Sequence, residues 1–505
     1  MSKQKPKVCF VGIGAKQLSI SLLSAVCKSR GWDTFLAYNS SLFNDYFNLS
    51  SSFLGKLFDE TDKVLKKVST VNPDLVAFSP LTATYQWSLE VARKIKERNS
   101  KIKIVFGGVH VSAIPNLAIE NEFIDFVVMG EGEKALVEIV DYINGEKDNP
   151  KISNTLYKTK KGTLIKGPMI DFCKDLDSIP NYDQEIWGDY LNLNGLYTTT
   201  VSRGCPNKCS YCFNNFYSKI PEEPTGYLRF RSVENVVNEL LEVKKEFNIK
   251  YIDFVDDSFT ANKKWLRMFL NEYREKIDLP FQCLVNSKLI DKEIVNLLEK
   301  SGCRWVQMGV QSVDSEYKKR NLNRHETLKE TVTALNLLRE SAIKIKLDHM
   351  LGLPDEPIKA QEKALEIYKK QTPDRIQTFW ITYLPGTEIL ENEYEKGRIS
   401  NKELKNIKLG KSKGSHRNTA NNHLSEKNKL YKKYELTFKI LPILPAFLKK
   451  KISSETVKKI PIKIFSPFAF LVDLMKNIFS KNPDFLNYLN YYIHQLKRVL
   501  KEKII

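Results

Sequence analysis

Three cysteines lie close together near the middle of the chain, and their side chains are the ones in the sequence best suited to chemistry. Cys205, Cys209 and Cys212 have the spacing C-x3-C-x2-C. Thiolates at this spacing can converge on one metal centre, and such soft ligands select zinc or an iron–sulfur cluster. A structural zinc ion requires four protein ligands, and the next cysteine, Cys283, lies far downstream. Three ligands on a four-iron cluster would leave one iron open for a substrate or cofactor.

The segment from Cys205 to Cys212 resembles the cluster motif of radical S-adenosylmethionine (SAM) enzymes. The resemblance implies a [4Fe–4S] cluster whose open iron chelates SAM, and cleavage of SAM to a 5′-deoxyadenosyl radical once the cluster is reduced. It also implies an electron donor of the flavodoxin or ferredoxin type. Tyr211 stands where the family has an aromatic residue beside the adenine of SAM. The alternatives are three unrelated cysteines or an incomplete zinc knuckle.

The cysteine loop must be positioned by the segment around it, residues 196–400, in which strand and helix patterns alternate six times. Six such units fit a partial (β/α)6 TIM barrel, whose chemistry takes place at the carboxyl ends of the strands. The loop follows the first expected strand. The strands are expected at residues 197–201, 251–255, 282–286, 305–310, 344–350 and 377–383.

Polar or small residues follow the later strands, and several resemble SAM-binding elements of the family. Asp256 follows the second strand, where the family binds the SAM amino group and where a carboxylate suits an ammonium ion. Gln311 replaces the more usual glutamate near the SAM ribose and carboxylate, and Gly352 follows the fifth strand near the adenine. Arg324 and His325 resemble a family loop before the next helix; the alternative is that both are surface residues.

The first 150 residues are expected to form a Rossmann-like α/β domain, because five apolar strands alternate with helical stretches. Such parallel sheets bind ligands at the carboxyl ends of their strands. The strand ends here are similar to those of cobalamin-binding domains fused to radical SAM enzymes. Small residues would let the backbone approach the nucleotide tail of the cofactor, and hydroxyl groups could bind it. The residues that carry this resemblance are Ser79, Leu81, Thr84, Gly107 and Gly108, followed by residues 130–133.

The loop after the first strand, residues 12–19, departs from many cobalamin domains because it contains no histidine. In those domains a histidine of this loop ligates cobalt. We therefore expect the lower face of the cobalt to lack an imidazole from this loop. His110 could approach the cofactor from another strand end, although a structural histidine is the favoured interpretation.

The composition is that of a globular protein of 505 residues, 42% hydrophobic and 28% charged. The eight cysteines form no disulfide framework, and the first residues carry no secretory signal, so a reduced, cytoplasmic protein is expected. The basic charge is concentrated at the end of the chain. Residues 401–505 contain 23 Lys and Arg against 7 Asp and Glu, a net charge of +16 out of +19.

This mainly helical C-terminal region contains a polar linker, residues 405–428, and two apolar stretches, residues 436–448 and 460–472. Neither stretch is long enough to span a bilayer. Apolar stretches flanked by lysines suit peripheral attachment to the inner face of an anionic membrane. The alternative is a helical cap on the barrel. No nucleic-acid-binding motif is present, so no nucleic acid partner is expected.

The two resemblances together predict four segments and one class of enzyme. The segments are a cobalamin-binding domain (1–150), a connector (151–195), a radical SAM barrel (196–400) and the basic region (401–505). The class implies transfer of a methyl group from methylcobalamin to an unactivated carbon of a small-molecule or lipid-like substrate. Non-methylating radical chemistry, such as cyclisation or rearrangement, is the alternative within enzymology, and a cobalamin-binding regulatory protein is the alternative outside it.

Overall fold

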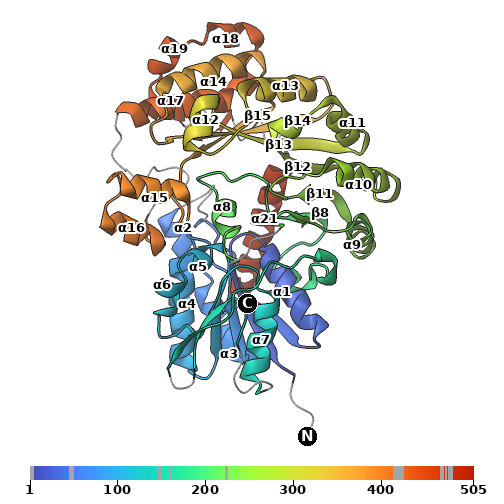
Figure 1. Cartoon of the computed structure of the whole chain (residues 1–505), viewed down its shortest axis with the longest axis vertical. Helices are drawn as coiled ribbons and strands as arrows, with labels where there is room; N and C mark the ends of the chain where they lie inside the picture. The colour runs from blue at the N-terminus through green and yellow to red at the C-terminus, as the bar shows by residue number, and fades with distance from the viewer. Residues whose placement is uncertain are drawn as a thin grey trace.

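The computed structural model describes residues 5–44, 51–145, 151–159, 162–221, 226–412, 426–466, 471–472, 475 and 482–504. It contains two parallel sheets that lie one above the other, with helices on their outer faces and between them (Figure 1). Mixed α/β architecture with a Rossmann-like domain and a half-barrel confirms the predicted fold class.

The first sheet has seven strands in the order β2-β1-β3-β4-β5-β6-β7. Strands β1 to β5 are parallel, and the hairpin β6–β7 continues the sheet in antiparallel pairing. The central strands are buried on both faces, as the apolar runs in the sequence predict. The strands are β1 (Lys7–Ile13), β2 (Asp33–Asn39), β3 (Leu75–Phe78), β4 (Lys103–Phe106), β5 (Phe126–Val128), β6 (Thr155–Lys158) and β7 (Leu164–Lys166).

Helices connect the parallel strands of this sheet and cover its two faces (Figure 1). They are α1 (Leu18–Ser29), α2 (Ser52–Leu57), α3 (Thr61–Val71), α4 (Tyr85–Arg98), α5 (Val109–Ala113), α6 (Pro115–Ile119) and α7 (Glu133–Ile143). Two 3-10 turns, Leu176–Ser178 and Glu185–Trp187, lie in the connector, where Trp187 is completely buried against the first domain.

The second sheet has six parallel strands in the order β15-β14-β13-β12-β11-β8. Each strand pairs with its neighbour in the chain, so the sheet curls into the predicted half-barrel. The six strands are β8 (Gly195–Thr199), β11 (Ile249–Phe254), β12 (Phe281–Val285), β13 (Cys303–Gln311), β14 (Lys344–Leu351) and β15 (Arg375–Trp380). A two-stranded ribbon, β9 (Ser202–Arg203) with β10 (Arg229–Phe230), stands beside it.

Helices α9, α10, α11, α13 and α14 lie on the outer face of the half-barrel, and their apolar sides form one large core with the strands. Side-chain caps fix several helix starts, such as Ser232 at α9 and the Thr327–Glu330 capping box at α13. The helices are α8 (Phe213–Tyr217), α9 (Val233–Glu246), α10 (Lys263–Lys276), α11 (Lys292–Lys300), α12 (Ser315–Asn321), α13 (Leu328–Arg339), α14 (Ile358–Lys370) and α15 (Glu388–Glu395).

The C-terminal region is helical where it is described, and it packs on both domains. Its helices are α16 (Asn401–Lys408), α17 (Glu426–Ile440), α18 (Ala446–Lys451), α19 (Ser454–Lys458) and α21 (Pro483–Ile504). Helix α16 occupies the start of the expected linker, and residues 413–425 lie outside the described residues. Helix α17 covers β15, the edge strand of the half-barrel, and Trp380 donates a hydrogen bond to Glu435 at 2.9 Å.

The apolar stretch 436–448 divides between two environments. Leu436, Phe438, Ile440 and Leu441 are buried, and Phe438 and Leu441 belong to the barrel core. Further along the same stretch, Phe447 is 62% exposed. The first part is therefore a helical cap on the barrel, the alternative considered from the sequence. The second stretch, residues 460–472, is described except for residues 467–470.

Candidate functional site

The cysteine loop lies at the carboxyl end of the half-barrel, where hydrogen bonds from two later segments hold its backbone. Ser210 donates from its amide to the Leu322 carbonyl at 3.0 Å and from its hydroxyl to the Asn321 carbonyl at 2.8 Å. The Ile389 amide, beyond β15, donates to the Ser210 carbonyl at 2.9 Å. The loop is thereby positioned by the end of α12 and the start of α15 as well as by β8.

The three cysteines are free thiols near one another, and their environment fits a cluster. Burial, together with the charges of Cys209, Asp257 and Cys205, raises the pKa of the Cys212 thiol to about 12. Within the described part of the chain, no three His, Cys, Asp or Glu side chains are arranged to hold one metal ion. Each cysteine ligand of a four-iron cluster binds a different iron atom. Cysteine thiolates are the ligands of iron–sulfur clusters, so Cys205, Cys209 and Cys212 are the residues that would hold one.

Tyr211 projects from the cysteine loop onto an apolar cluster at the ends of β14 and β15, which includes Met350, Leu353 and Ile381. Its hydroxyl accepts a hydrogen bond from Arg324 at 2.8 Å. The aromatic ring thus has a fixed position beside the cysteines.

Arg324 connects three parts of the site through its guanidinium group. Besides the Tyr211 hydroxyl, it donates to the Gly309 carbonyl at 2.9 Å and to Glu326 at 2.7 Å. Its side chain is only 10% exposed. Arg324 therefore lies within the site, as the resemblance implies, whereas His325 is exposed at the surface, which was the alternative for both residues.

Gln311 ends β13 at a bulge and has a φ of +63°, a value that residues other than glycine rarely adopt. Its side chain lies over Gly309, because a Cβ built on that glycine would stand 2.8 Å from the Gln311 amide nitrogen. Backbone strain of this kind is found mostly at functional sites. Gly352, with φ +71°, follows β14 next to the apolar cluster that holds Tyr211.

Asp256 is placed differently from its expected role toward SAM. The carboxylate is 1% exposed, and it accepts hydrogen bonds from the Val201 amide at 3.0 Å, the Ser202 amide at 2.6 Å and the Ser202 hydroxyl. It therefore fixes the chain where β8 leads into the cysteine loop.

The neighbouring Asp257 faces the cysteines instead. Its charge raises the pKa of the Cys205 and Cys212 thiols, and its side chain is hydrogen-bonded by Asn214 of α8. The sequence contains both aspartates side by side, and only their opposite orientations at the strand end separate their roles.

In the first domain, Ser79, Gly107 and Gly108 meet at the carboxyl ends of β3 and β4. Gly108 has a φ of +86°, and a Cβ there would stand 2.8 Å from the Ser79 hydroxyl. A Cβ on Gly107 would meet nothing nearer than 3.7 Å. These strand ends leave the backbone bare, which fits the close approach of a large cofactor such as cobalamin.

Thr84 and Leu81 form the turn that follows Ser79. The Thr84 hydroxyl accepts from the Leu81 amide at 3.0 Å, so it braces the turn. The Leu81 side chain is 48% exposed.

His110 is 2% exposed and packs against the Tyr85 ring at 4.4 Å between ring centroids. Its Nδ1 lies 3.0 Å from the Thr82 hydroxyl, and burial lowers its pKa to about 4, so the ring is neutral at ordinary pH. These contacts agree with the structural interpretation of His110.

The two sets of strand ends face each other across a charged interface (Figure 1). Glu131 pairs with Arg203 at 2.9 Å and with Arg229 at 2.9 Å, and Glu133 pairs with Arg203 at 2.6 Å. Helix α5, which follows Gly108, packs against α8, which follows Cys212. The sequence marks residues 130–133 as part of the cobalamin resemblance, but it does not reveal these partners.

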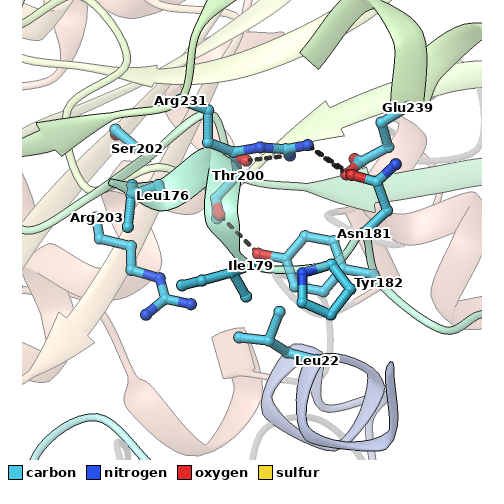
Figure 2. Close-up of a pocket in the computed structure, with 11 residues that line it drawn as sticks. Leu22, Leu176, Ile179, Asn181, Tyr182, Thr200, Ser202, Arg203, Arg231 and Glu239 are labelled. Carbon is cyan, nitrogen blue, oxygen red and sulfur yellow. Dashed lines mark hydrogen bonds and ion pairs between the residues drawn. The ribbon is translucent and has the colours of Figure 1, made fainter. Parts of the chain in front are cut away.

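Figure 2 shows a pocket on the connector side of this interface. Four of its polar lining residues bind one another: Arg231 and Glu239 form an ion pair at 2.8 Å, and Tyr182 and Thr200 share a hydrogen bond at 2.8 Å. The side chains around it join the connector to β8, and none of the cofactor candidates lines it. The remaining lining residues are Leu22, Leu176, Ile179, Pro180, Asn181, Ser202 and Arg203.

Comparison with known proteins identifies both domains. The Radical SAM superfamily matches residues 199–367, and the B12 binding domain matches residues 15–140. An uncharacterized methyltransferase of Pyrococcus horikoshii is 28% identical over 66% of this chain and 72% of its own length. An anaerobic magnesium-protoporphyrin IX monomethyl ester cyclase of Rubrivivax gelatinosus is 24% identical over 64% of this chain, which spans 59% of the cyclase.

Solved structures share the fold at low sequence identity. The methyltransferase TsrM of Kitasatospora setae, with cobalamin and a [4Fe–4S] cluster bound, superposes with a TM-score of 0.62 at 16% identity over 78% of each chain. The cobalamin-dependent SAM radical enzyme OxsB has a TM-score of 0.65 at 15% identity, covering 99% of this chain and 80% of its own. These matches assign residues 15–140 to the B12 binding domain and residues 199–367 to the Radical SAM superfamily, so the chain is a radical SAM enzyme with a cobalamin-binding domain.

Proposed function

We propose that the protein is a methyltransferase that acts on an unactivated carbon of its substrate. The observation that carries this proposal is the contact of α5 with α8, which brings the bare strand ends at Gly107 and Gly108 toward the cysteine loop. The bound cofactors would supply the methyl group and the radical that activates the substrate. Relatives named as methyltransferases, including a hopanoid C-3 methylase of Methylococcus capsulatus at 23% identity, support the same reaction.

Within this proposal the chain orients the reactants and excludes water. Cys205, Cys209 and Cys212 hold the cluster, and Arg324 keeps Tyr211 in place for the adenine of SAM. Asp257, rather than the fully engaged Asp256, offers a carboxylate to the SAM ammonium group. A flavodoxin- or ferredoxin-type protein supplies the electrons that reduce the cluster.

The test uses anaerobically reconstituted full-length protein, cobalamin, SAM and dithionite. Wild type should contain about four irons and form both 5′-deoxyadenosine and S-adenosylhomocysteine, the latter being the product of methyl donation. C209A should lose the cluster and both products, whereas C27A, which removes a buried cysteine of α1, should keep them. Formation of 5′-deoxyadenosine without any S-adenosylhomocysteine would refute methyl transfer.

Non-methylating chemistry is the second candidate, because the similarity to magnesium-protoporphyrin ester cyclases is almost as extensive in this chain. The same assay separates methyl transfer from non-methylating chemistry, since an enzyme that uses SAM only as a radical source forms 5′-deoxyadenosine but no S-adenosylhomocysteine. Retention of cobalamin without S-adenosylhomocysteine would favour this candidate.

We also propose that the C-terminal region attaches the enzyme to the surface of an anionic membrane. No described helix is long and apolar enough to cross a bilayer. Exposed apolar side chains instead recur along this part of the chain, with Phe447 62%, Ile464 76% and Leu471 55% exposed. Lys450 and Lys451 lie three and four residues after Phe447. Each lysine near an anionic leaflet contributes about 1 kcal/mol, and the apolar side chains would enter the interface.

Flotation with anionic liposomes tests this attachment. The variant F447S/I464S should bind at least fivefold less than wild type, and high salt should weaken binding of the wild type because it screens the lysines. L241S/M268S removes two exposed apolar side chains from α9 and α10, and it should float like wild type. Equal flotation of both variants would refute the C-terminal attachment surface.

A further inference from the structure

The interior of the half-barrel is polar, although barrels of this kind are usually filled by branched apolar side chains. Side chains along a strand alternate between the two faces of the sheet. On β14, Ile345 and Leu347 belong to the core shared with the outer helices. Lys346 and Asp348 therefore face the interior.

Hydrogen bonds between neighbouring strands cross this interior. Gln307 of β13 donates to Asp348 at 2.7 Å, and Gln282 of β12 donates to Asp253 of β11 at 2.8 Å. Amide and carboxyl side chains of neighbouring strands therefore lie next to each other inside the half-barrel.

The last described helix, α21, enters this interior from the end of the chain. Asp484, in its first turn, forms an ion pair with Lys346 and accepts a hydrogen bond from Gln282. Further along, the Tyr491 hydroxyl donates to the Ser40 carbonyl at the end of β2 in the first domain, at 2.7 Å. The helix therefore closes one side of the space between the two sheets, where it is visible behind the half-barrel in Figure 1.

Oδ1 of Asp348 and Oε1 of Gln377 are two of the buried oxygen atoms that have no hydrogen-bond partner among the described residues. The Asp348 residue is 9% exposed. Asp348 and Gln377 are paired in register on β14 and β15, so the two acceptors are neighbours. Buried polar atoms without hydrogen bonds are rare in native proteins, because each costs about 1–3 kcal/mol.

The pair stands beside the proposed SAM elements. Asp348 is the register partner of Gly309 on β13, whose carbonyl accepts the hydrogen bond from Arg324. The charged groups that act on Asp348 are Lys346, Arg375 and Asp484. With Asp253, the interior holds three carboxyl groups (Asp253, Asp348 and Asp484) and two cationic groups (Lys346 and Arg375). One further positive group would balance these charges.

We propose that Asp348 and Gln377 recognise the substrate through hydroxyl or ammonium groups that donate hydrogen bonds to their free oxygens. The proposal rests on the proposed function, because it names the substrate class of that same site. It predicts a polar end on the substrate, which the half-barrel interior would hold while the reacting carbon lies toward the cofactors. Asp484 of α21 forms the opposite side of the site.

The experiment is equilibrium dialysis of reconstituted holoenzyme against a bacterial polar metabolite extract and, separately, against a lipid extract, followed by mass spectrometry. Compounds enriched by wild type should carry hydroxyl or amine groups. D348N exposes an uncharged amide and Q377L removes the acceptor, and each should lower the enrichment at least tenfold. D125N makes the same change at a carboxylate that pairs with Lys96 and Lys103 in the first domain, and it should match wild type.

Three outcomes would overturn the proposal. Wild-type enrichment by both D348N and Q377L would mean that water alone fills the interior. A matching loss of SAM affinity, measured by calorimetry, would assign the pair to SAM. Enrichment of compounds that lack hydrogen-bond donors would exclude the proposed class. Failure of the proposed function is distinguishable, because wild-type enzyme would then form no S-adenosylhomocysteine whatever it enriches.

Discussion

Glu131 of the first domain accepts a hydrogen bond from Arg203 at 2.9 Å, and Arg203 stands two residues before the first cysteine of the cluster loop. The same carboxylate binds Arg229 and the Cys173 amide. One side chain thus joins the end of β5, the connector and the ribbon that leads into the cysteine loop. The contact fixes the distance between the two cofactor sites, because both lie at the ends of the elements that it joins.

Replacing Glu131 should therefore uncouple the two domains more than it damages either. Loss of one partner from a buried ion pair costs about 3–5 kcal/mol, and this partly exposed network should lose about 2–3 kcal/mol. E131Q should lower the thermal midpoint by several degrees and reduce S-adenosylhomocysteine formation more than 5′-deoxyadenosine formation. The control is E97Q, which breaks the exposed Arg93–Glu97 pair and should change neither. A parallel decline of both products would contradict a positioning role.

The same network predicts a dependence of stability on pH. Burial raises the pKa of Glu131, but the hydrogen bond from Arg229 and the charges of Arg203 and Arg229 outweigh it and lower the pKa on balance. A lowered pKa in the folded state contributes stability above the pKa of the unfolded chain, which is lost as the pH falls through the folded value. In urea unfolding, the advantage of wild type over E131Q should be complete at pH 7 and should shrink below about pH 4. An advantage that grows toward acid would contradict the charged pairing.

Arg324 should be essential for SAM cleavage because its planar guanidinium group binds three partners at once. A lysine keeps the charge but cannot bind the Tyr211 hydroxyl, the Gly309 carbonyl and Glu326 together. Losing two hydrogen bonds of about 1 kcal/mol each predicts a decrease of roughly thirtyfold in SAM cleavage by R324K, with the iron content unchanged. Y211F removes one of these bonds and should decrease cleavage about fivefold. Wild-type activity in R324K would show that the hydrogen bonds do not position Tyr211.

The bare backbone at Gly108 can be tested against a second glycine of similar φ. G108A adds a Cβ that would stand 2.8 Å from the Ser79 hydroxyl, at a φ of +86°. G31A imposes a similar φ strain at +77°, but a Cβ there meets nothing within 4 Å. Both should lose about 1 kcal/mol of stability, whereas only G108A should weaken cobalamin binding, measured by absorbance titration, by at least tenfold. Equal binding by the two variants would exclude Gly108 from the cofactor site.

The cobalt of bound cobalamin should lack a protein imidazole on its lower face. Residues 12–19 contain no histidine, and His110 is held by Thr82 and Tyr85. Electron paramagnetic resonance of the cob(II)alamin form should show no splitting from a protein nitrogen. A splitting that disappears in H110A would identify His110 as the ligand and would overturn this expectation.

The sequence by itself determined the features that depend on short-range spacing. The three cysteines are close because they are close along the chain, and the alternation of apolar strands and amphipathic helices specifies two parallel sheets with sites at their strand ends. It also placed Gly108 and Gln311 at those ends, since such positions follow the last apolar residue of each strand. These properties need only local geometry and burial.

Only the tertiary structure decided which side chains act together. Glu131 and Arg203 form an ion pair although they are 72 residues apart in the sequence. The hydroxyl groups of Tyr38 and Tyr491 lie 2.7 Å apart, and these residues are separated by 453 positions. Adjacent aspartates in the sequence received opposite roles, because the turn after β11 directs Asp256 to the Val201 and Ser202 amides and leaves Asp257 toward the cysteines. A hydrogen bond or ion pair depends on distances of a few ångströms between remote segments, and the packing of the two domains sets those distances.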